Sequence, residues 1–189
     1  MQDRYAGDVG DFGKFSLLRS LFSDPKKYSI GVVWYKYPDE SHNGDGRHID
    51  YLGNSNYKQC DQSLVECLSR VVTGQRSIAY LESLALLPEN TIYYSSTLDF
   101  HNTWKTQSNE DRSFRKNERI EWLKKAIEST SSCNVIFLDP DNGLEIPSIP
   151  HIHQIRSGKY AYYSEVASLF ENKEACVIYH HLNRNNPHE

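Results

Sequence analysis

The residues with the clearest chemical potential are Asp139, Asp141 and Asn142, which follow a run of four apolar residues at 135–138. Two of the four are β-branched, so the run predicts a buried strand that stops abruptly at Asp139-Pro140. In an open α/β sheet, ligands bind outside the carboxyl ends of the strands, so we expect the three acceptor side chains at the mouth of a site. A turn without chemistry is the alternative, because the same residues are also turn formers.

A second polar loop follows a β-rich run at residues 28–35 and contains His42, Gly44, Gly46 and Arg47. Gly44 and Gly46 form a G-x-G, which allows backbone N–H groups to approach a nucleotide-like ligand. The third glycine of a complete dinucleotide fingerprint is missing. A long surface loop therefore remains the alternative for this segment.

The N-terminal segment has three glycines, at 7, 10 and 13, just before and within a predicted helix over residues 11–22. Asp11 is the expected N-cap, and apolar residues recur at helical spacing as far as Phe22. The glycines indicate either a flexible start or backbone that passes close to a ligand, with Lys14 directed at it.

The remaining elements alternate along the chain. We expect strands at residues 28–35, 91–94, 135–138 and 175–179, and helices at 61–72, 77–87, 119–127 and 160–170. This order predicts a single α/β domain, spanning residues 1–189, with right-handed crossovers and a mainly parallel sheet. Ile120, Leu123 and Ile127 are predicted to face inward, whereas the charged residues 101–119 are expected to form a solvated helix start or mobile loop.

Composition sets further limits. A chain of 189 residues supports one domain, and its net charge of −4 counts against tight non-specific nucleic-acid binding. No run approaches the ~20 apolar residues of a membrane helix, so we expect a cytoplasmic protein without a membrane partner. The four cysteines lack C-x-x-C spacing and are expected to be reduced, structural and not part of a zinc finger. The oligomeric state is left open.

The tail after residue 182 and the residues just before it contain His180, His181 and Arg184. They are candidates for a local nucleic-acid contact, strongest where imidazole is charged. A frayed terminus explains the same residues equally well. The His151-x-His153 pair has no third potential ligand at a sequence spacing typical of metal sites. We therefore expect it to lie in an exposed loop without a metal.

Three separated loops together resemble the Rossmann-like adenine-N6 methyltransferases that modify large-subunit ribosomal RNA. That family has an A-G-N-x-A-D-V-L-K helix start, a T-H-A-G-A-G-R motif and a D-P-P-Y motif. The segment from Ala6 to Lys14 is similar to the first, Ser41 to Arg47 to the second, and Asp139-Pro140 to the start of the third. Asp141 stands where that family has a second proline, and Asn142 where it has an aromatic residue.

The resemblance implies a Rossmann-like, methyltransferase-like domain that uses S-adenosylmethionine. Lys14, His42, Gly44, Gly46 and Arg47 would then belong to the cofactor end of the cleft. Asp139 would be the acceptor for the target amine of a nucleic acid base or nucleotide. Asn142 and the carbonyl of Pro140 could help it by proximity and orientation, and Asp141 is a further catalytic candidate. The chain ends soon after the last predicted strand, so we expect a sheet without the terminal antiparallel hairpin, because either the C-terminus is missing or the fold is trimmed.

Two other functions fit the same residues. Carboxylates on the loops could hold Mg²⁺ and cleave phosphodiesters, with Lys159 as a phosphate or water partner; they are Asp39, Asp45, Asp139, Asp141 and Glu145. Alternatively, the domain is a catalytically degenerate module that binds a nucleotide or a partner protein, because Asp-Pro-Asp-Asn offers no aromatic ring for stacking on adenine.

Overall fold

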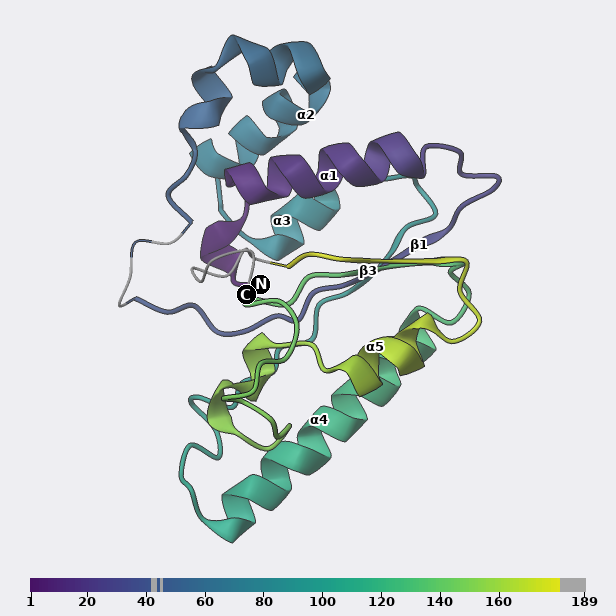
Figure 1. Cartoon of the computed structure of the whole chain (residues 1–189). Coiled ribbons are helices and arrows are strands. Elements are labelled where there is room, and N and C mark those ends of the chain that lie inside the picture. Colours follow the sequence, from purple (N-terminus) through teal and green to yellow (C-terminus); the bar gives the residue numbers. More distant parts are fainter. Residues whose placement is uncertain (42–43, 45, 181–189) are drawn as a thin grey trace.

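The computed structural model describes residues 1–41, 44 and 46–180, and within them the chain forms a Rossmann-like α/β sandwich (Figure 1). Four parallel strands lie in the order β2-β1-β3-β4. Their bounds are β1 Ile30–Val33, β2 Ile92–Tyr94, β3 Val135–Leu138 and β4 Ala175–Ile178. The predicted parallel sheet is confirmed, and no antiparallel strand occurs among the described residues.

The two central strands are apolar because both of their faces are covered. Every residue of β1 and β3 is buried. Along β1, Val32 faces one core cluster and Val33 the other, and Phe137 and Leu138 divide in the same way on β3. A strand buried on both sides cannot alternate apolar with polar residues, which explains the continuous apolar run in the sequence.

Helices cover the two faces of the sheet separately (Figure 1). On one face lie α1 (Val9–Leu21), α2 (Ser55–Thr73) and α3 (Ile78–Ser83), and on the other lie α4 (Asn109–Ser129) and α5 (Tyr163–Phe170). Short 3-10 turns occur at Asp3–Tyr5, Asp50–Gly53 and Ile155–Lys159. The layers therefore leave only the two ends of the strands open for a site.

The start of α1 differs from the prediction. The N-cap is Asp8, whose carboxylate accepts a hydrogen bond from the Asp11 amide at 3.2 Å. Asp11 itself is fully buried, so its prediction as the N-cap was wrong. The sequence contains two aspartates three residues apart, and helix spacing alone does not say which of them lies outside the first turn.

The charged segment before and within α4 also differs from the prediction. Arg115 and Arg119 are buried, whereas Ile120 is 47% exposed. The expectation of a solvated segment was therefore wrong for these two arginines, and the inward position predicted for Ile120 was wrong. Residues 115, 119 and 122 lie on one face of the helix, so this face rather than that of Ile120 packs toward the sheet.

The four cysteines are free, in agreement with the reduced state expected of them. Cys133 is buried, Cys67 and Cys176 are half-buried, and Cys60 is exposed. In the part of the chain that the structure describes, no helix combines the length and the apolar character needed to cross a bilayer.

Candidate functional site

The candidate site lies where the sheet changes direction. From β1 the chain moves outward to β2, and then crosses back to β3 on the other side of β1. The carboxyl ends of β1 and β3 therefore diverge into separate loops, and a ligand crevice opens between such ends. Here the first residue of the chain enters that crevice, because the Met1 ammonium donates to Tyr35 O at 2.8 Å and to Asp139 O at 3.4 Å.

A buried ion cluster lies at the end of β3. The Lys14 ammonium is 2.9 Å from Asp139 Oδ2 and 3.2 Å from Asp11 Oδ1, and it lies 4.2 Å from the centre of the Tyr179 ring. The Gly7 amide donates to the other oxygen of Asp11 at 2.8 Å. Lys14 and Asp139, which are 125 positions apart in the sequence, thus meet directly.

Burial and charge act against each other in this cluster. Burial alone would lower the pKa of Lys14, but the carboxylates of Asp139 and Asp11 outweigh it and raise that pKa, so the ammonium stays charged. Burial raises the pKa of Asp11 to about 6, even though Lys14 acts in the opposite direction. One of the two carboxylates beside Lys14 is therefore close to its titration range at mildly acidic pH.

A second ion cluster surrounds Asp141. Its Oδ2 accepts from Gln2 Nε2 at 3.0 Å and lies 3.4 Å from Lys159 Nζ, which also binds Glu40 at 2.5 Å. Its Oδ1 lies 3.5 Å from the Met1 ammonium. Burial would raise the pKa of Asp141, but the ammonium of Met1 and Lys159 outweigh it and lower that pKa. Asp141 is therefore a charged anchor for the N-terminal segment.

Two hollows adjoin these clusters. The smaller one, which we call the switch-point hollow, has a volume of about 30 Å³ and is lined by Met1, Tyr5, Asp8, Lys14, Asp139, Pro140, Asp141 and Tyr179. The larger one, the polar pocket, has about 540 Å³ and is lined by Tyr5, Tyr37, Asp39, Glu40, Ser41, His101, Asn142, Arg156, Lys159 and Tyr160. Tyr5 lines both. The switch-point hollow has room for about one water molecule, whereas the polar pocket is in the size range of small-molecule sites.

The loops after β1 and β3 both contribute to the polar pocket, through Ser41 and Asn142. Asn142 is exposed at the rim, and its backbone amide donates to Lys159 O at 2.8 Å. Gly44 and Arg47 are exposed and line neither hollow. His42 lies outside the described residues.

Gly46 is placed by contact with the chain's own N-terminal segment. Its φ is +80°, and a Cβ there would lie 2.7 Å from Arg4 O and from the Tyr5 ring. Arg76 ties the same loop to this segment, because it donates to Gly46 O and to Ala6 O, each at 2.8 Å. The glycine is needed for this close packing, and it brings the loop against Tyr5, the residue common to both hollows.

Of the three C-terminal candidates for a nucleic-acid contact, the structure describes His180. The ring nitrogen Nδ1 of His180 accepts a hydrogen bond from the Leu144 amide at 3.1 Å, which ties the end of β4 to the loop after β3. The close approach requires Gly143, whose φ is +91° and whose missing Cβ would lie 2.3 Å from that nitrogen. His181 and Arg184 lie outside the described residues.

Three contributors to the site carry no signal in the sequence that identifies them. Gln2 and Tyr179 belong to no motif, and Glu40 lies in a loop with several other carboxylates. Lys159 was considered only for phosphodiester cleavage. Each is recruited by a long-range contact, and spacing along the chain does not report such contacts.

Neither a family model, nor a curated protein, nor a solved structure matches this chain.

Of the five carboxylates predicted as Mg²⁺ ligands, Asp45 lies outside the described residues, and Asp39 accepts from the Arg4 amide at 3.2 Å. The other three are engaged separately. Asp139 binds Lys14, Asp141 binds Lys159, and Glu145 accepts from the Tyr163 amide at 2.9 Å at the start of α5. Within residues 1–41, 44 and 46–180, no three His, Cys, Asp or Glu side chains are grouped as metal ligands. Among the described residues the arrangement therefore offers acceptor oxygens and fixed ammonium groups rather than a shared cation site.

Proposed function

We propose that this chain is an S-adenosylmethionine-dependent methyltransferase-like enzyme that methylates an amine of a nucleotide or a nucleic acid base. The observation that carries the proposal is the 2.9 Å contact between Lys14 of α1 and Asp139 at the carboxyl end of β3. The resemblance in sequence assigns Lys14 to the cofactor end and Asp139 to the target amine. Methyl transfer requires these two ends to be adjacent, because the reacting atoms must approach to about 3–3.5 Å.

The polar pocket has side chains that fit the chemical groups of such a cofactor. Asp39 and Glu40 offer carboxylates to ribose hydroxyls, Lys159 offers an ammonium to a carboxylate, and Tyr37 offers a ring to adenine. Burial would raise the pKa of Glu40, but its contacts with Lys159 and Gln2 outweigh burial and lower that pKa. This acceptor therefore stays charged. Bound there, S-adenosylmethionine would supply an electrophilic methyl group.

Asp139 would act by accepting a hydrogen bond from the target amine. The contact orients the nitrogen lone pair and stabilises the positive charge that develops on nitrogen as its bond to carbon forms. Lys14 would hold the Asp139 carboxylate in place. In the present arrangement Met1 and Gln2 lie between Asp139 and the polar pocket, so the N-terminal segment must move for the two to be joined.

Calorimetry and a methyl-transfer assay test the proposal with Asp139→Asn, and the exposed Asp50→Asn is the matched control. Wild type and both variants should bind S-adenosylmethionine or its demethylated product at micromolar concentration. Transfer of a labelled methyl group to RNA or a nucleotide should fall at least about 100-fold in Asp139→Asn only, because one positioned acceptor is lost. A flat calorimetric trace at about 1 mM ligand, or equal turnover in the two variants, contradicts it.

A nucleotide-binding module without turnover is the second candidate, and the 30 Å³ switch-point hollow favours it. There the Asp139 carboxylate is already bound by Lys14, and no space remains for an amine. The two candidate functions are distinguished by whether methyl transfer accompanies nucleotide binding. If a nucleotide raises the melting temperature while methyl transfer stays absent for every acceptor tried, the binding module is correct.

A further inference from the structure

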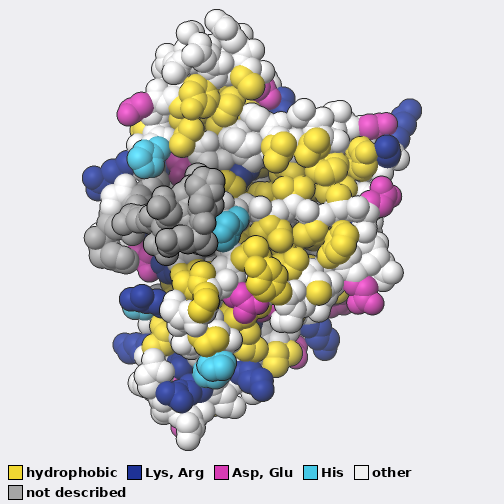
Figure 2. Space-filling model, in the orientation of Figure 1, with side chains coloured by type: hydrophobic (Ala, Val, Ile, Leu, Met, Phe, Trp, Pro, Cys, Tyr) yellow, Lys and Arg dark blue, Asp and Glu magenta, His cyan; other side chains and the backbone are white. Residues whose placement is uncertain are grey.

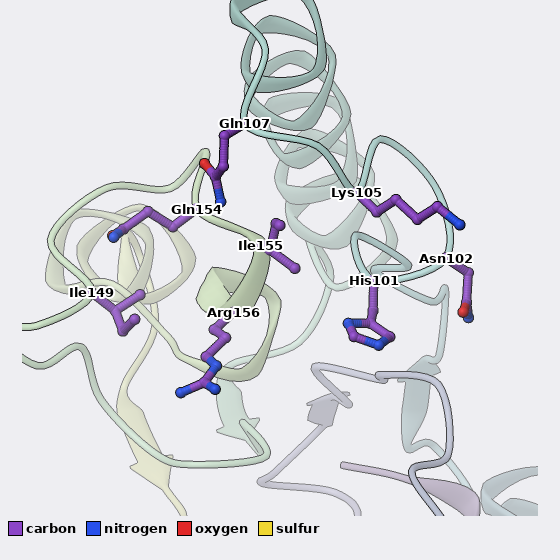
Figure 3. A pocket seen from close by; sticks show the side chains of 8 residues that line it. All are labelled: His101, Asn102, Lys105, Gln107, Ile149, Gln154, Ile155 and Arg156. Atoms are coloured by element: carbon purple, nitrogen blue, oxygen red, sulfur yellow. The ribbon is translucent and has the colours of Figure 1, made fainter.

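A separate pocket, which we call the basic pocket, lies between the loop that precedes α4 and the segment that leads into the turn Ile155–Lys159. Its volume is about 670 Å³. Figure 3 shows His101, Asn102 and Lys105 on one side and Ile149, Gln154 and Arg156 on the other. None of its lining residues is a carboxylate.

The charge of this pocket is opposite to that of the chain, which has a net charge of −4. Lys105 and Arg156 are exposed, and within the described part of the chain neither forms an ion pair. Lys159, in contrast, is held by Glu40 and Asp141. Two cations that form no ion pair among the described residues face this cavity, which favours an anion there. Arg156 also faces the polar pocket, which Asp39 and Glu40 line.

The pocket walls are fixed by a buried side chain. Arg115 is fully buried on α4, and its guanidinium donates to Trp104 O, to Thr106 O at 2.9 Å and to His153 O at 2.5 Å. It therefore joins the loop that carries Lys105 to the segment that carries Arg156. The spacing of the two cations is thus set by the fold rather than by two independent loops.

The surroundings of the pocket are also positive. Burial lowers the pKa of His153. Electrostatic repulsion from neighbouring side chains lowers it further, and these are His151, Arg112, Arg115 and Lys116. Figure 2 shows Lys, Arg and His side chains over the lower part of the molecule, around the start of α4. These cations surround the pocket together with the carboxylates of Glu110 and Asp111 in the first turn of α4.

His101 and Arg156 line both the basic pocket and the polar pocket, so the two cavities share a wall. From this geometry we infer that the basic pocket binds phosphate groups of a nucleotide or oligonucleotide whose base is directed toward the methyl-transfer site. Arg156 contacts the phosphate nearest the shared wall, and Lys105 contacts phosphate farther out. Guanidinium and ammonium groups are the usual donors to phosphate oxygens.

The inference specifies the substrate class of the proposed methyltransferase and rests on that function for the placement of the base. Phosphate binding itself does not require methyl transfer. The two can therefore fail separately, and S-adenosylmethionine binding is measured on the same protein samples.

The test uses two probes, adenosine monophosphate and a fluorescent single-stranded RNA of about ten nucleotides, with adenosine as the uncharged comparison. The test variant is Lys105→Gln/Arg156→Gln. The matched control, Lys26→Gln/Lys58→Gln, removes the same charge from exposed positions away from the pocket. Circular dichroism melting checks that each variant is folded, and Lys105→Arg/Arg156→Lys retains the charges.

We expect the full chain to bind at least one phosphate-bearing probe more tightly than adenosine. The test variant should weaken that binding at least about tenfold. It should also make the slope of log binding constant against log salt concentration shallower by about 1.4 for the RNA, the value for two single-strand phosphate contacts. The control should change it less than about twofold, and the charge-retaining variant should recover most of it.

The two probes distinguish the sources of the phosphate. If the monophosphate binds and responds to the test variant, the pocket takes a free nucleotide, and if only the RNA does, it takes a strand. The inference is overturned if neither probe binds below about 1 mM, or if the test variant and the control bind alike. Retained S-adenosylmethionine binding with no phosphate binding would overturn this inference alone.

Discussion

At the scale of single residues, the two aspartates after β3 have different surroundings. Asp139 is held by one side chain from α1, and Asp141 by Gln2, Lys159 and the Met1 ammonium. A carboxylate removed from water is stable only when such partners replace its hydration. The apolar run of β3 carries both aspartates into the interior, and the N-terminal residues supply the compensating groups.

Asp11 gives this cluster a pH dependence that can be measured. Its pKa rises from 3.8 to about 6 on burial, so the folded chain binds the proton more tightly than the unfolded chain. The contribution of Asp11 to stability is therefore full below about pH 4 and is lost as the pH rises to about 6. Relative to Asp11→Asn, the free energy of unfolding of the wild type should fall on the order of 1–3 kcal/mol across this window.

Urea denaturation at several pH values measures this difference, with Asp50→Asn as the exposed control. Asp141 and Glu40, whose pKa values are lowered, contribute in the opposite sense, but they are present in both proteins and cancel. A difference between wild type and Asp11→Asn that stays constant, or grows, from pH 4 to 6 contradicts the assignment.

At the scale of elements, α4 is held to the sheet face by charged side chains as well as apolar ones. The Arg119 guanidinium contacts Glu165 through Nε at 2.5 Å and Nη2 at 2.8 Å, and it also donates to Ser157 O and Tyr160 O, both at 2.6 Å. This one side chain joins α4 to α5 and to the turn before it. Four of the five N–H groups of the guanidinium thus donate to an acceptor.

The free energy of unfolding should depend on the Arg119–Glu165 ion pair. Arg119→Met leaves the buried Glu165 charge without its cation, and it should lower the free energy of unfolding by about 3–5 kcal/mol. Arg119→Met/Glu165→Gln removes the stranded charge and should recover at least about 1 kcal/mol of that loss. Denaturant unfolding of the double-mutant cycle measures both, with the exposed Lys124→Met as control. Strict additivity of the two substitutions would rule out the coupling.

The central strands β1 and β3 were predictable because burial on both faces leaves a continuous apolar run. The edge strands β2 and β4, which are less buried, were also located from short runs rich in β-forming residues. The burial of Arg115 and Arg119 could not be predicted. Charged residues four positions apart indicate a solvated helix face unless the acceptors of their hydrogen bonds are known. Those acceptors are backbone carbonyls and Glu165, 38–46 residues farther along the chain or in the preceding loop. For the same reason the sequence identified Asp139 and Lys14 but not the Gln2 and Glu40 contacts beside them.

At the scale of the whole molecule, the N-terminal segment connects the two central loops across the open end of the sheet. Met1 O accepts from the Tyr37 amide at 2.8 Å, and Gln2 is fully buried between the loops after β1 and β3. The segment thus separates the switch-point hollow from the polar pocket. Joining the two cavities requires its displacement, and any ligand that needs both must supply the free energy for it.

Gln2 is the side chain that holds this segment most directly. Its Nε2 donates to Asp141 and to Glu40, and its Oε1 accepts from the Glu40 amide at 2.9 Å and from Arg4 Nε at 2.8 Å. Gln2→Ala removes all four contacts and should lower the free energy of unfolding by about 1–3 kcal/mol. The exposed Gln62→Ala is the control and should leave it nearly unchanged.

If the segment covers the site, the same substitution favours the open state, and a ligand that spans both cavities should bind more tightly. A shift of about 1.4 kcal/mol toward the open state lowers its apparent dissociation constant up to about tenfold. Hydrogen exchange gives a measure that needs no ligand: the Tyr5 and Tyr37 amides, which donate to Gln2 O and Met1 O, should exchange faster in Gln2→Ala than in Gln62→Ala. Unchanged exchange at both amides would mean that Gln2 does not hold the segment closed, and tighter binding would then need another cause.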